Sequence, residues 1–284
     1  AVSLRGVKEH PLTQGRLCAK VNHYIERAYS PERLLHPLRR IGPKGGRRFE
    51  QIGWDEALDL VAGRLREIVA EHGGEAVLPY SYMGTQGVVQ GASLDRRFFA
   101  RLGATRLVRA VCGSAPARGL TATQGGTKGM LPEDLRHSRF IVLWGTNTIV
   151  TNVHLWPFVT QAQKAGARVV VVDPVETRTA RAADWHVRPR PGTDAALALG
   201  LMHVIVAEGL HDADYVERHA VGFGELRDRL AEYPPRRVAE ITGLEEDEIV
   251  ELARAYATTR PQAIRTLIAM GHHEHGAMTL RTIA

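Results

Sequence analysis

The sequence is poor in cysteine and has no long apolar run. Two cysteines, Cys18 and Cys112, lie far apart in 284 residues, which does not suggest a disulfide framework. No segment approaches the roughly 18 consecutive apolar residues of a membrane span. No basic run is interleaved with stacking aromatics, the pattern typical of nucleic-acid binding. We therefore expect no membrane span and no nucleic-acid partner.

Two glycine-rich nucleotide fingerprints are also missing. The segment TQGGTKG (Thr123–Gly129) lacks the residue order of a phosphate-binding P-loop, so an ATPase is rejected. No G-x-G-x-x-G follows a predicted strand, which weakens an ordinary NAD or flavin enzyme. His272, His273 and His275 form no i, i+4 pair on a predicted helix, so a solvated turn is favoured over a zinc site.

The composition that is present favours a large globular chain. Hydrophobic residues make up 44% of the sequence, enough for a buried core and for more than one domain. The 37 basic and 31 acidic residues give a net charge of +6, scattered rather than clustered. This mild excess suits a polyanionic ligand and suits an ordinary solvated surface equally well.

The stretch from 140 to 200 is the most informative. Two β-branched apolar runs, one ending at Gly145 and one ending at Asp173, read as strands buried on both faces. About twenty residues between them suffice for a helix, which predicts a βαβ unit. Ligands of such units bind outside the carboxyl ends of the strands, where Gly145, Asn147, Asp173 and Thr177 fall. Glycine lets backbone N–H groups approach a pyrophosphate, and an acidic side chain accepts hydrogen bonds from a ribose or a guanine edge. The stretch therefore predicts a nucleotide-type site.

Other segments show the period of helices or strands. Helices are predicted over 54–72, 93–102, 197–208, 212–220, 222–233 and 245–258. Strands are predicted over 76–82, 105–111 and 262–271, with a glycine loop at 83–87.

These patterns allow two interpretations of Cys112 and favour a structural role for Cys18. Cys112 follows a predicted strand and precedes small residues, so it is either a thiolate facing a cofactor metal or a packed cysteine. Cys18 is by itself a small buried hydrophobe, and Lys20 a surface lysine. One cysteine cannot hold an iron–sulfur cluster, which usually takes four.

Taken together, these segments resemble the molybdopterin oxidoreductases of the dimethyl-sulfoxide-reductase superfamily, nearest to formate dehydrogenase and nitrate or thiosulfate reductase catalytic subunits. The resemblance covers essentially the whole chain and depends on the order of several modest motifs. These are HPLTQGRLCAK, RLLHPLRRIG, FEQIGWDEAL, AVC…G, WGTN, VVVVDPVETRTARAADWH, RPGTDAALALG and GLHDADYVERHAVGF.

The resemblance implies two cofactors and a role for each matched residue. Cys112 matches the ligand of molybdenum in a bis-molybdopterin guanine dinucleotide cofactor. Cys18 matches the fourth ligand of a [4Fe–4S] cluster, and Lys20 matches the lysine between cluster and pterin. The segments that contact the guanine dinucleotide match Gly145, Asn147, Asp173, Thr177, Gly192, Thr193 and Asp194. The implied activity is two-electron redox chemistry on a small-molecule substrate, with an electron-transfer subunit or a ferredoxin-like protein as partner.

The implied fold is α/β, a Rossmann-like parallel sheet with flanking helices. We expect 1–35 to be a remnant of an iron–sulfur domain, 36–108 the first part of a discontinuous α/β domain, and 109–284 the dinucleotide-binding domain. We expect a fragment, because the other three cluster cysteines and a C-terminal domain belong outside these residues. A cytoplasmic location is expected, with export to the periplasm left open.

The sequence also departs from the family pattern. Gly113 follows Cys112, where formate dehydrogenases carry a catalytic histidine, so formate is in doubt, and the substrate stays open among formate, nitrate, thiosulfate and others. Two other functions remain as alternatives. One is an NAD or flavin oxidoreductase, and the other is a non-catalytic module that binds only the dinucleotide or another subunit.

Overall fold

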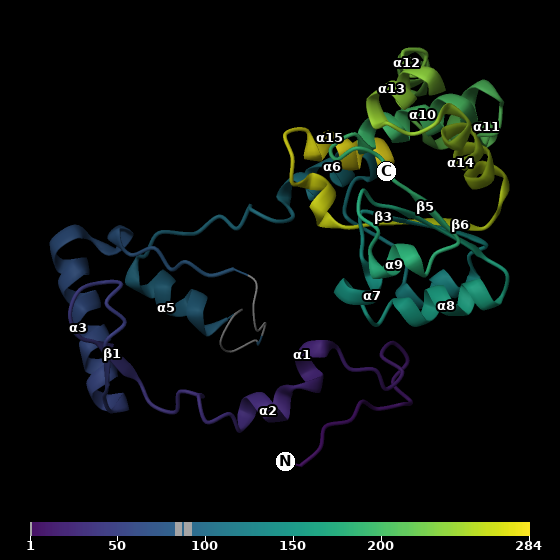
Figure 1. Cartoon of the computed structure of the whole chain (residues 1–284). Coiled ribbons are helices and arrows are strands. Elements are labelled where there is room, and N and C mark those ends of the chain that lie inside the picture. Colours follow the sequence, from purple (N-terminus) through teal and green to yellow (C-terminus); the bar gives the residue numbers. More distant parts are fainter. Residues whose placement is uncertain (1, 83–86, 88–92) are drawn as a thin grey trace. The chain divides into compact units, whose positions relative to one another are not determined.

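The computed structural model describes residues 2–82, 87 and 93–284. The chain separates into two compact units (Figure 1), unit 1 with Ala1–His23 and Ala110–Ala284, and unit 2 with Tyr24–Arg109. Residues 1–23 therefore group with the C-terminal part of the chain. The three-part division at 35 and 108 stays a prediction.

Unit 1 is built around a parallel four-stranded sheet. Its strands are β3 (Phe140–Trp144), β4 (Arg168–Val172), β5 (Trp185–Val187) and β6 (Gln262–Thr266), in the order β5-β4-β3-β6. The two β-branched runs form β3 and β4, and every residue of β3 is buried. This confirms the predicted parallel α/β fold. The strand predicted over 262–271 is shorter than expected, because the chain turns into the short 3₁₀-helix η3 (Ile268–Gly271).

Helices cover both faces of this sheet (Figure 1). One face packs against α8 (Trp156–Lys164), with α7 (Thr148–Thr151), α9 (Arg178–Arg181) and the 3₁₀-helix η2 (Pro132–His137) nearby. The other face packs against α10 (Asp194–Ala207), α13 (Pro235–Thr242) and α14 (Glu246–Thr258). Alternate residues of β3 serve the two cores, with Ile141 and Leu143 in the first and Phe140, Val142 and Trp144 in the second. This two-sided burial explains why the strands lack a polar face.

Two of the predicted helices lie in the connection from α10 to α14. Here α11 (Ala213–His219) begins at Asp212, whose side chain accepts a hydrogen bond from the Tyr215 amide. The helix α12 (Phe223–Leu230) follows, so the expected helices in this region are confirmed.

Three helices of eight or more residues in unit 1 lie where the sequence predicted none, and one of them is α13, between two predicted helices. The segment after Cys112 forms α6 (Ser114–Gln124), and the last residues form α15 (Gly276–Ile283). A Cβ on Gly119 would lie 2.2 Å from the Ala277 carbonyl oxygen, so α6 and α15 approach backbone to backbone. The small residue at 119 is what allows this close packing.

Unit 2 contains α2 (Tyr24–Ala28), the antiparallel pair β1 (Leu38–Arg40) and β2 (Phe49–Gln51), α3 (Trp54–His72), η1 (Gly74–Ala76) and α5 (Leu94–Leu102). The predicted helices over 54–72 and 93–102 are confirmed, and Gly103 ends α5 in the left-handed conformation. Arg39 bridges the strand pair and α3 through Glu50 and Glu56, and its hydrogen bond to Glu50 raises the pKa of Arg39.

The two strands predicted in unit 2 are wrong. Residues 77–82 and 104–110 have an extended course without a strand ladder in the described part. A backbone hydrogen bond from Thr105 N to Val77 O, 3.0 Å long, joins them. The predicted glycine loop lies outside the described residues except for Gly87.

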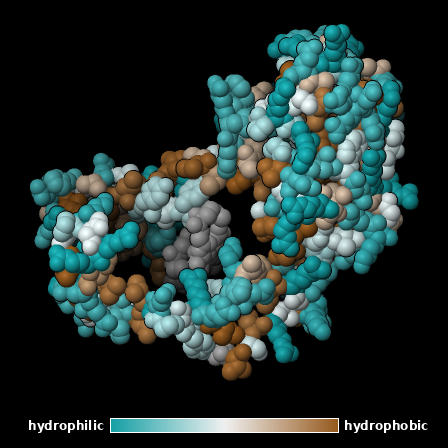
Figure 2. Space-filling view, in the orientation of Figure 1, coloured by the Kyte–Doolittle hydropathy of each residue, from teal (hydrophilic) through white to brown (hydrophobic). Residues whose placement is uncertain are grey.

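Helix α3 has an apolar stripe but buries none of its residues. Leu58 is 62% exposed and Val61 58% exposed. Hydrophobic side chains also appear elsewhere on the surface of each unit (Figure 2). The helix predicted from local periodicity is therefore present, although its apolar face covers no buried core among the described residues.

Candidate functional site

Three loops of unit 1 leave the same edge of the sheet, at the carboxyl ends of β3, β4 and β5. Trp144 is in register with Val172 and with Thr266, and Val172 is in register with Val187. Residues that follow these strands are consequently neighbours in space. The structure thus brings together the predicted residues of 145–147, 173–177 and 192–194 at one edge. Their assignment as cofactor ligands stays a prediction.

Gly145 forms the tip of β3 and must be glycine for two reasons. Its φ is +62°, a conformation that costs other L-residues free energy. A Cβ at this position would also lie 2.7 Å from Met270 Cγ, closer than carbon atoms pack. The Gly145 amide donates to the Val172 carbonyl at 2.8 Å. The tip is thus fixed by β4 on one side and by Met270 on the other.

Asn147 is held in one orientation by Thr179. The Thr179 hydroxyl accepts a hydrogen bond from the Ile149 amide at 3.0 Å and donates to Asn147 Oδ1 at 2.8 Å. Since the hydroxyl gives its single proton to the Asn147 oxygen, the Nδ2 amide group is the part left to bind elsewhere. A half-buried Asn147 therefore offers N–H donors, which suit anionic or carbonyl oxygens.

The loop after β4 is stabilised by local hydrogen bonds. Asp173 Oδ1 accepts from the Val175 amide at 2.9 Å, and the Asp173 carbonyl accepts from His186 Nε2 at 2.8 Å. Thr177 caps α9 by accepting from the Ala180 amide at 3.1 Å. These bonds fix the loop but use one oxygen of the Asp173 carboxylate for its own backbone.

The loop after β5 leads into α10 at Asp194. Gly192 has a φ of +80°, and the Thr193 hydroxyl donates to the Arg190 carbonyl at 2.6 Å. Asp194 Oδ1 accepts from the indole Nε1–H of Trp144 at 2.8 Å. Trp144 is 1% exposed, so this bond ties the loop to the buried end of β3. One carboxylate oxygen of Asp194 is thereby oriented by the core.

Cys112 lies two residues before α6, in contact with the segment that follows β6. Its carbonyl accepts a hydrogen bond from His272 Nε2 at 2.9 Å, and the thiol is half-buried. His272 follows Met270 by two residues, and Met270 touches Gly145. A continuous set of contacts thus joins Cys112 to the tip of β3. The strand expected immediately before Cys112 is absent from the described residues, and an irregular segment replaces it.

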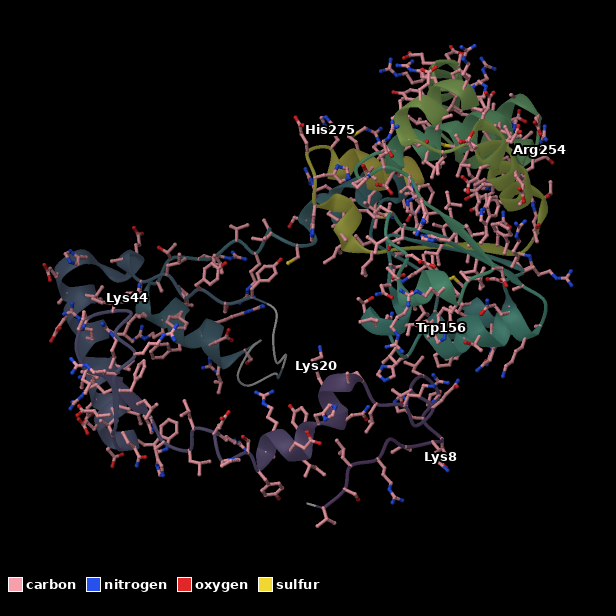
Figure 3. All side chains as sticks on the ribbon, in the orientation of Figure 1. Lys8, Lys20, Lys44, Trp156, Arg254 and His275 are labelled. Carbon is pink, nitrogen blue, oxygen red and sulfur yellow. The ribbon has the colours of Figure 1, made fainter. Side chains whose placement is uncertain are left out.

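Cys18 and Lys20 lie in the N-terminal segment of unit 1. Cys18 precedes the short helix α1 (Ala19–Asn22) and is half-buried, while Lys20 is exposed and projects from that helix (Figure 3). The segment is attached to the βαβ unit, because His154 Nε2 lies 3.1 Å from the Arg16 carbonyl. Its tie to unit 1 was not expected from the sequence.

Four residues that support this edge were missed by the sequence analysis: Trp144, Thr179, Met270 and His272. Each contacts a partner between 32 and 160 positions away in the sequence. Neighbouring residues therefore give little indication of these contacts. For Trp144 a weak signal exists, since an indole at the end of a buried strand needs a partner for its N–H.

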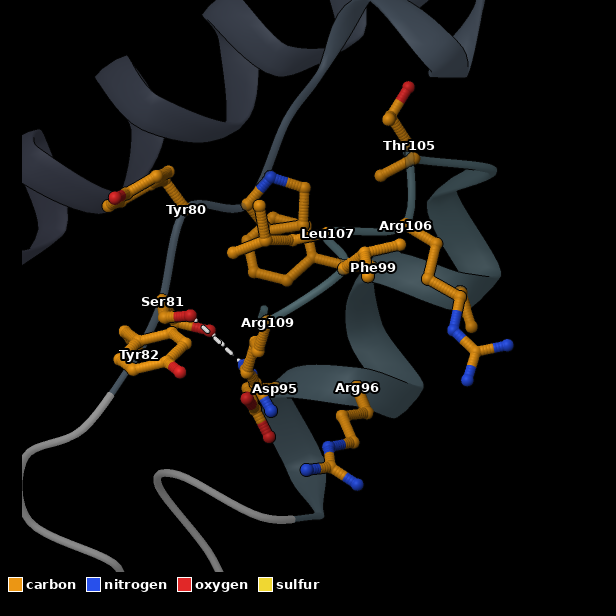
Figure 4. A pocket seen from close by; sticks show the side chains of 14 residues that line it. Tyr80, Ser81, Tyr82, Asp95, Arg96, Phe99, Thr105, Arg106, Leu107 and Arg109 are labelled. Carbon is orange, nitrogen blue, oxygen red and sulfur yellow. Dashed lines mark hydrogen bonds between the residues drawn. The ribbon is translucent and has the colours of Figure 1, made fainter. Parts of the chain in front are cut away.

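Unit 2 has a separate pocket of about 1140 Å³ between the extended segments and α5 (Figure 4). Aromatic and basic side chains line it, and Arg109 is held by Ser81 through bonds to its carbonyl and hydroxyl oxygens at 3.0 and 2.6 Å. None of the predicted site residues lies in it.

The donor groups at the sheet edge fit a dinucleotide and one soft metal ligand. Glycine backbone at positions 145 and 192 and the Asn147 amide suit phosphate oxygens, and two carboxylates suit ribose or base N–H and O–H groups. The Cys112 thiolate suits a soft transition metal that takes its other ligands elsewhere. Within the described residues no group of three or more His, Cys, Asp or Glu side chains is placed to hold a metal ion alone. The assignment of Cys18 to an iron–sulfur cluster, which usually takes four cysteines, stays a prediction.

A parallel sheet with helices on both faces places the chain in the α/β class, whose ligands bind at the carboxyl edge of the sheet. A family model described as molybdopterin oxidoreductase matches residues 33–284. The chain therefore belongs to the molybdopterin oxidoreductase family, which confirms the resemblance found in the sequence.

Individual relatives agree with this family. The chain is 41% identical over 283 residues to the probable oxidoreductase YoaE of Bacillus subtilis, covering all of the chain and 42% of the relative. It is 31% identical over 307 residues to the dimethyl sulfoxide reductase DmsA of Escherichia coli, covering 96% of the chain and 38% of the relative. The solved structure of acetylene hydratase from Pelobacter acetylenicus matches with a TM-score of 0.78 at 33% identity, over 96% of this chain and 38% of that chain. The chain thus spans about two-fifths of the length of these relatives.

Proposed function

We propose that these residues form the dinucleotide-binding and metal-ligating part of a molybdenum oxidoreductase catalytic subunit. The cofactor would be bis-molybdopterin guanine dinucleotide. The observation that carries the proposal is the series of contacts from Cys112 through His272 and Met270 to Gly145. These contacts connect the Cys112 backbone to the sheet edge where a dinucleotide would bind, and the family membership supports Cys112 as the molybdenum ligand.

Each loop has a distinct role in this proposal. Backbone amides near Gly145 and Gly192 and the Asn147 side-chain amide would bind phosphate oxygens. The Asp173 and Asp194 carboxylates would accept hydrogen bonds from the ribose and the guanine edge. Thr177 and Thr193 would keep their loops in shape, as their hydrogen bonds to the backbone indicate. Held this way, the dinucleotide would anchor the pterin, and the Cys112 thiolate would ligate the metal.

Molybdenum held by pterin dithiolenes and the Cys112 thiolate supplies two-electron redox chemistry when bound. The protein's part is to fix the thiolate, to shield it partly from water and to orient a small-molecule substrate near it. Gly113, after the thiolate, carries no acid or base, so proton transfer would fall to another residue or to the substrate. This argues against formate as the substrate.

Cys18 is proposed as one ligand of a [4Fe–4S] cluster, the other three cysteines lying outside these 284 residues. Lys20 would provide the electron-transfer contact between cluster and pterin, and an electron-transfer protein would be the partner. Among the described residues, no helix combines the length and the apolar character needed to cross a bilayer. We propose a cytoplasmic location, with export as the alternative.

Single substitutions in the full-length protein test these roles. Cys112→Ala is expected to abolish turnover while the guanine nucleotide released from the protein stays near the parent amount, because the dinucleotide is held by other loops. Cys18→Ser is the matched control, expected to remove the cluster's visible absorption but not the molybdenum. Lys20→Met is expected to slow reduction of the cluster in a single turnover. Full turnover in Cys112→Ala would refute the ligand assignment.

A further inference from the structure

The turn between β6 and α15 touches two parts of the proposed site at once. It starts where β6 ends, at Thr266, in register with Trp144 of β3. Residues 268–272 therefore leave the sheet directly beside the Gly145 tip. We call these five residues the β6 turn.

Met270 is the contact of the β6 turn with the tip of β3. It is 5% exposed, and its Cγ and Sδ would lie 2.7 and 3.0 Å from a Cβ on Gly145. The thioether thus occupies the space that a side chain at 145 would need. Met270 and Gly145 cannot shift independently without opening a buried gap.

Gly271 is the contact of the β6 turn with α6. A Cβ at 271 would lie 2.4 Å from Pro116 Cγ, in the first turn of the helix that follows Cys112. The turn is also closed on itself, since a Cβ on Gly276 would lie 2.1 Å from the Gly271 carbonyl oxygen. Both glycines are buried, so the backbone of the turn is packed directly against α6.

His272 adds a directional bond to this packing. Its Nε2 lies 2.9 Å from the Cys112 carbonyl oxygen, and because a carbonyl only accepts, the imidazole must carry its proton on Nε2. The bond joins residues 160 positions apart. It fixes the peptide group on the carboxyl side of the Cys112 Cα, and so limits the directions open to the thiol.

We propose that the β6 turn sets the place of the Cys112 thiolate relative to the Gly145 tip, with His272 as a positioning residue for Cys112. Met270 fixes the middle of the turn and His272 its last residue. The role as a metal ligand rests on the proposed function, whereas the positioning of the thiol does not. The thiol of the cofactor-free protein should report on it directly.

The test is the rate at which iodoacetamide alkylates Cys112 in cofactor-free full-length protein, read by mass spectrometry. Trypsin releases Cys112 in the peptide 110–118 and Cys18 in the peptide 17–20, so each sample carries its own reference. His272→Ala is expected to speed alkylation of Cys112 by about threefold to tenfold, the range that one lost hydrogen bond allows. Cys18 should react at the parent rate.

Two variants serve as controls, one just after the β6 turn and one at its last residue. His275→Ala removes an exposed imidazole three residues away and is expected to leave the Cys112 rate unchanged. His272→Gln keeps a side-chain N–H donor and is expected to restore a rate near that of the parent. An unchanged Cys112 rate in His272→Ala overturns the proposal. If His272→Ala speeds alkylation of both Cys112 and Cys18, the result for His272→Gln decides. Alkylation of Cys112 in His272→Gln that is as fast as in His272→Ala would overturn the proposal.

The loaded enzyme gives a second readout. The Mo(V) electron paramagnetic resonance spectrum should change in His272→Ala and return in His272→Gln, since it senses the orientation of a thiolate ligand. If Cys112→Ala gave the same Mo(V) spectrum as the parent, the proposed role of Cys112 as metal ligand would be refuted instead. The alkylation result would then still decide whether His272 positions Cys112, so the two failures are distinguishable.

Discussion

Replacing Gly145 by alanine should destabilise unit 1 through two separable effects. The first is backbone strain, because φ at this position is +62°. The second is overpacking, because the new Cβ would lie 2.7 Å from Met270 Cγ and 3.0 Å from its Sδ. Met270 is buried, so its side chain cannot swing into solvent to relieve the contact.

The magnitudes follow from these two geometries. A left-handed conformation costs a residue other than glycine about 1–2 kcal/mol. Overpacking a close-packed site costs about 1–3 kcal/mol. Gly145→Ala is therefore expected to lower the free energy of unfolding by about 2–5 kcal/mol in total.

Gly209→Ala is the matched control. Gly209 has a φ of +67°, and nothing lies within 4 Å of a Cβ placed there. This variant therefore carries only the backbone strain, about 1–2 kcal/mol. The difference between the two variants isolates the contact with Met270.

Urea unfolding of the cofactor-free protein, followed by tryptophan fluorescence, measures both variants. Trp144 is fully buried next to Gly145 and reports on this edge of the sheet. A Gly145→Ala/Met270→Ala double variant should be less destabilised than the sum of its single variants by about 1–3 kcal/mol, because the contact is gone. If Gly145→Ala costs no more than Gly209→Ala, the described packing of Met270 against the β3 tip is refuted.

Three further outcomes are expected. Asn147→Asp should reduce the guanine nucleotide recovered from full-length protein about tenfold or more, because it replaces amide donors by a negative charge where phosphates are proposed; equal recovery in both proteins would contradict it. Thr177→Ala should lower the free energy of unfolding by about 0.5–2 kcal/mol through loss of the α9 cap, measured in urea, and no loss would argue against the cap. The hydrogen bond from Arg254 lowers the pKa of Glu208 below its ordinary value of 4.5. The pair therefore stabilises the fold above that value and loses this contribution as the pH falls through the lowered pKa. Glu208→Gln should therefore lose less stability than the parent as the pH falls below 4.5. The measurement is the melting temperature of both proteins against pH, and an equal fall in both would contradict the prediction.

The candidate site was predictable where its residues follow buried strands. Two β-branched runs placed 145–147 and 173–177 at the carboxyl edge, because parallel strands joined by a helix end on the same side. The family resemblance added 192–194 and both cysteines. Nothing in these motifs indicated that Thr179 orients Asn147, that Trp144 orients Asp194, or that His272 binds the peptide of Cys112.

By itself the sequence determined the elements whose stability is local. Helix α3 forms from its own periodicity and ends at Gly73, α5 ends at Gly103, and α11 begins at Asp212, because caps and apolar spacing act within a few residues.

Only the tertiary structure decided the elements that depend on distant partners. Among the described residues, the segments 77–82 and 104–110 form no strand ladder, because β propensity alone does not supply a paired neighbour. The glycine-rich segment after Cys112 became α6 because α15 packs against its backbone at Gly119, a contact between residues more than 150 positions apart. The stability of a cap or of an amphipathic helix depends on residues a few positions apart, which the sequence shows directly. The stability gained by packing depends on which distant surfaces come into contact, and only the folded structure shows that.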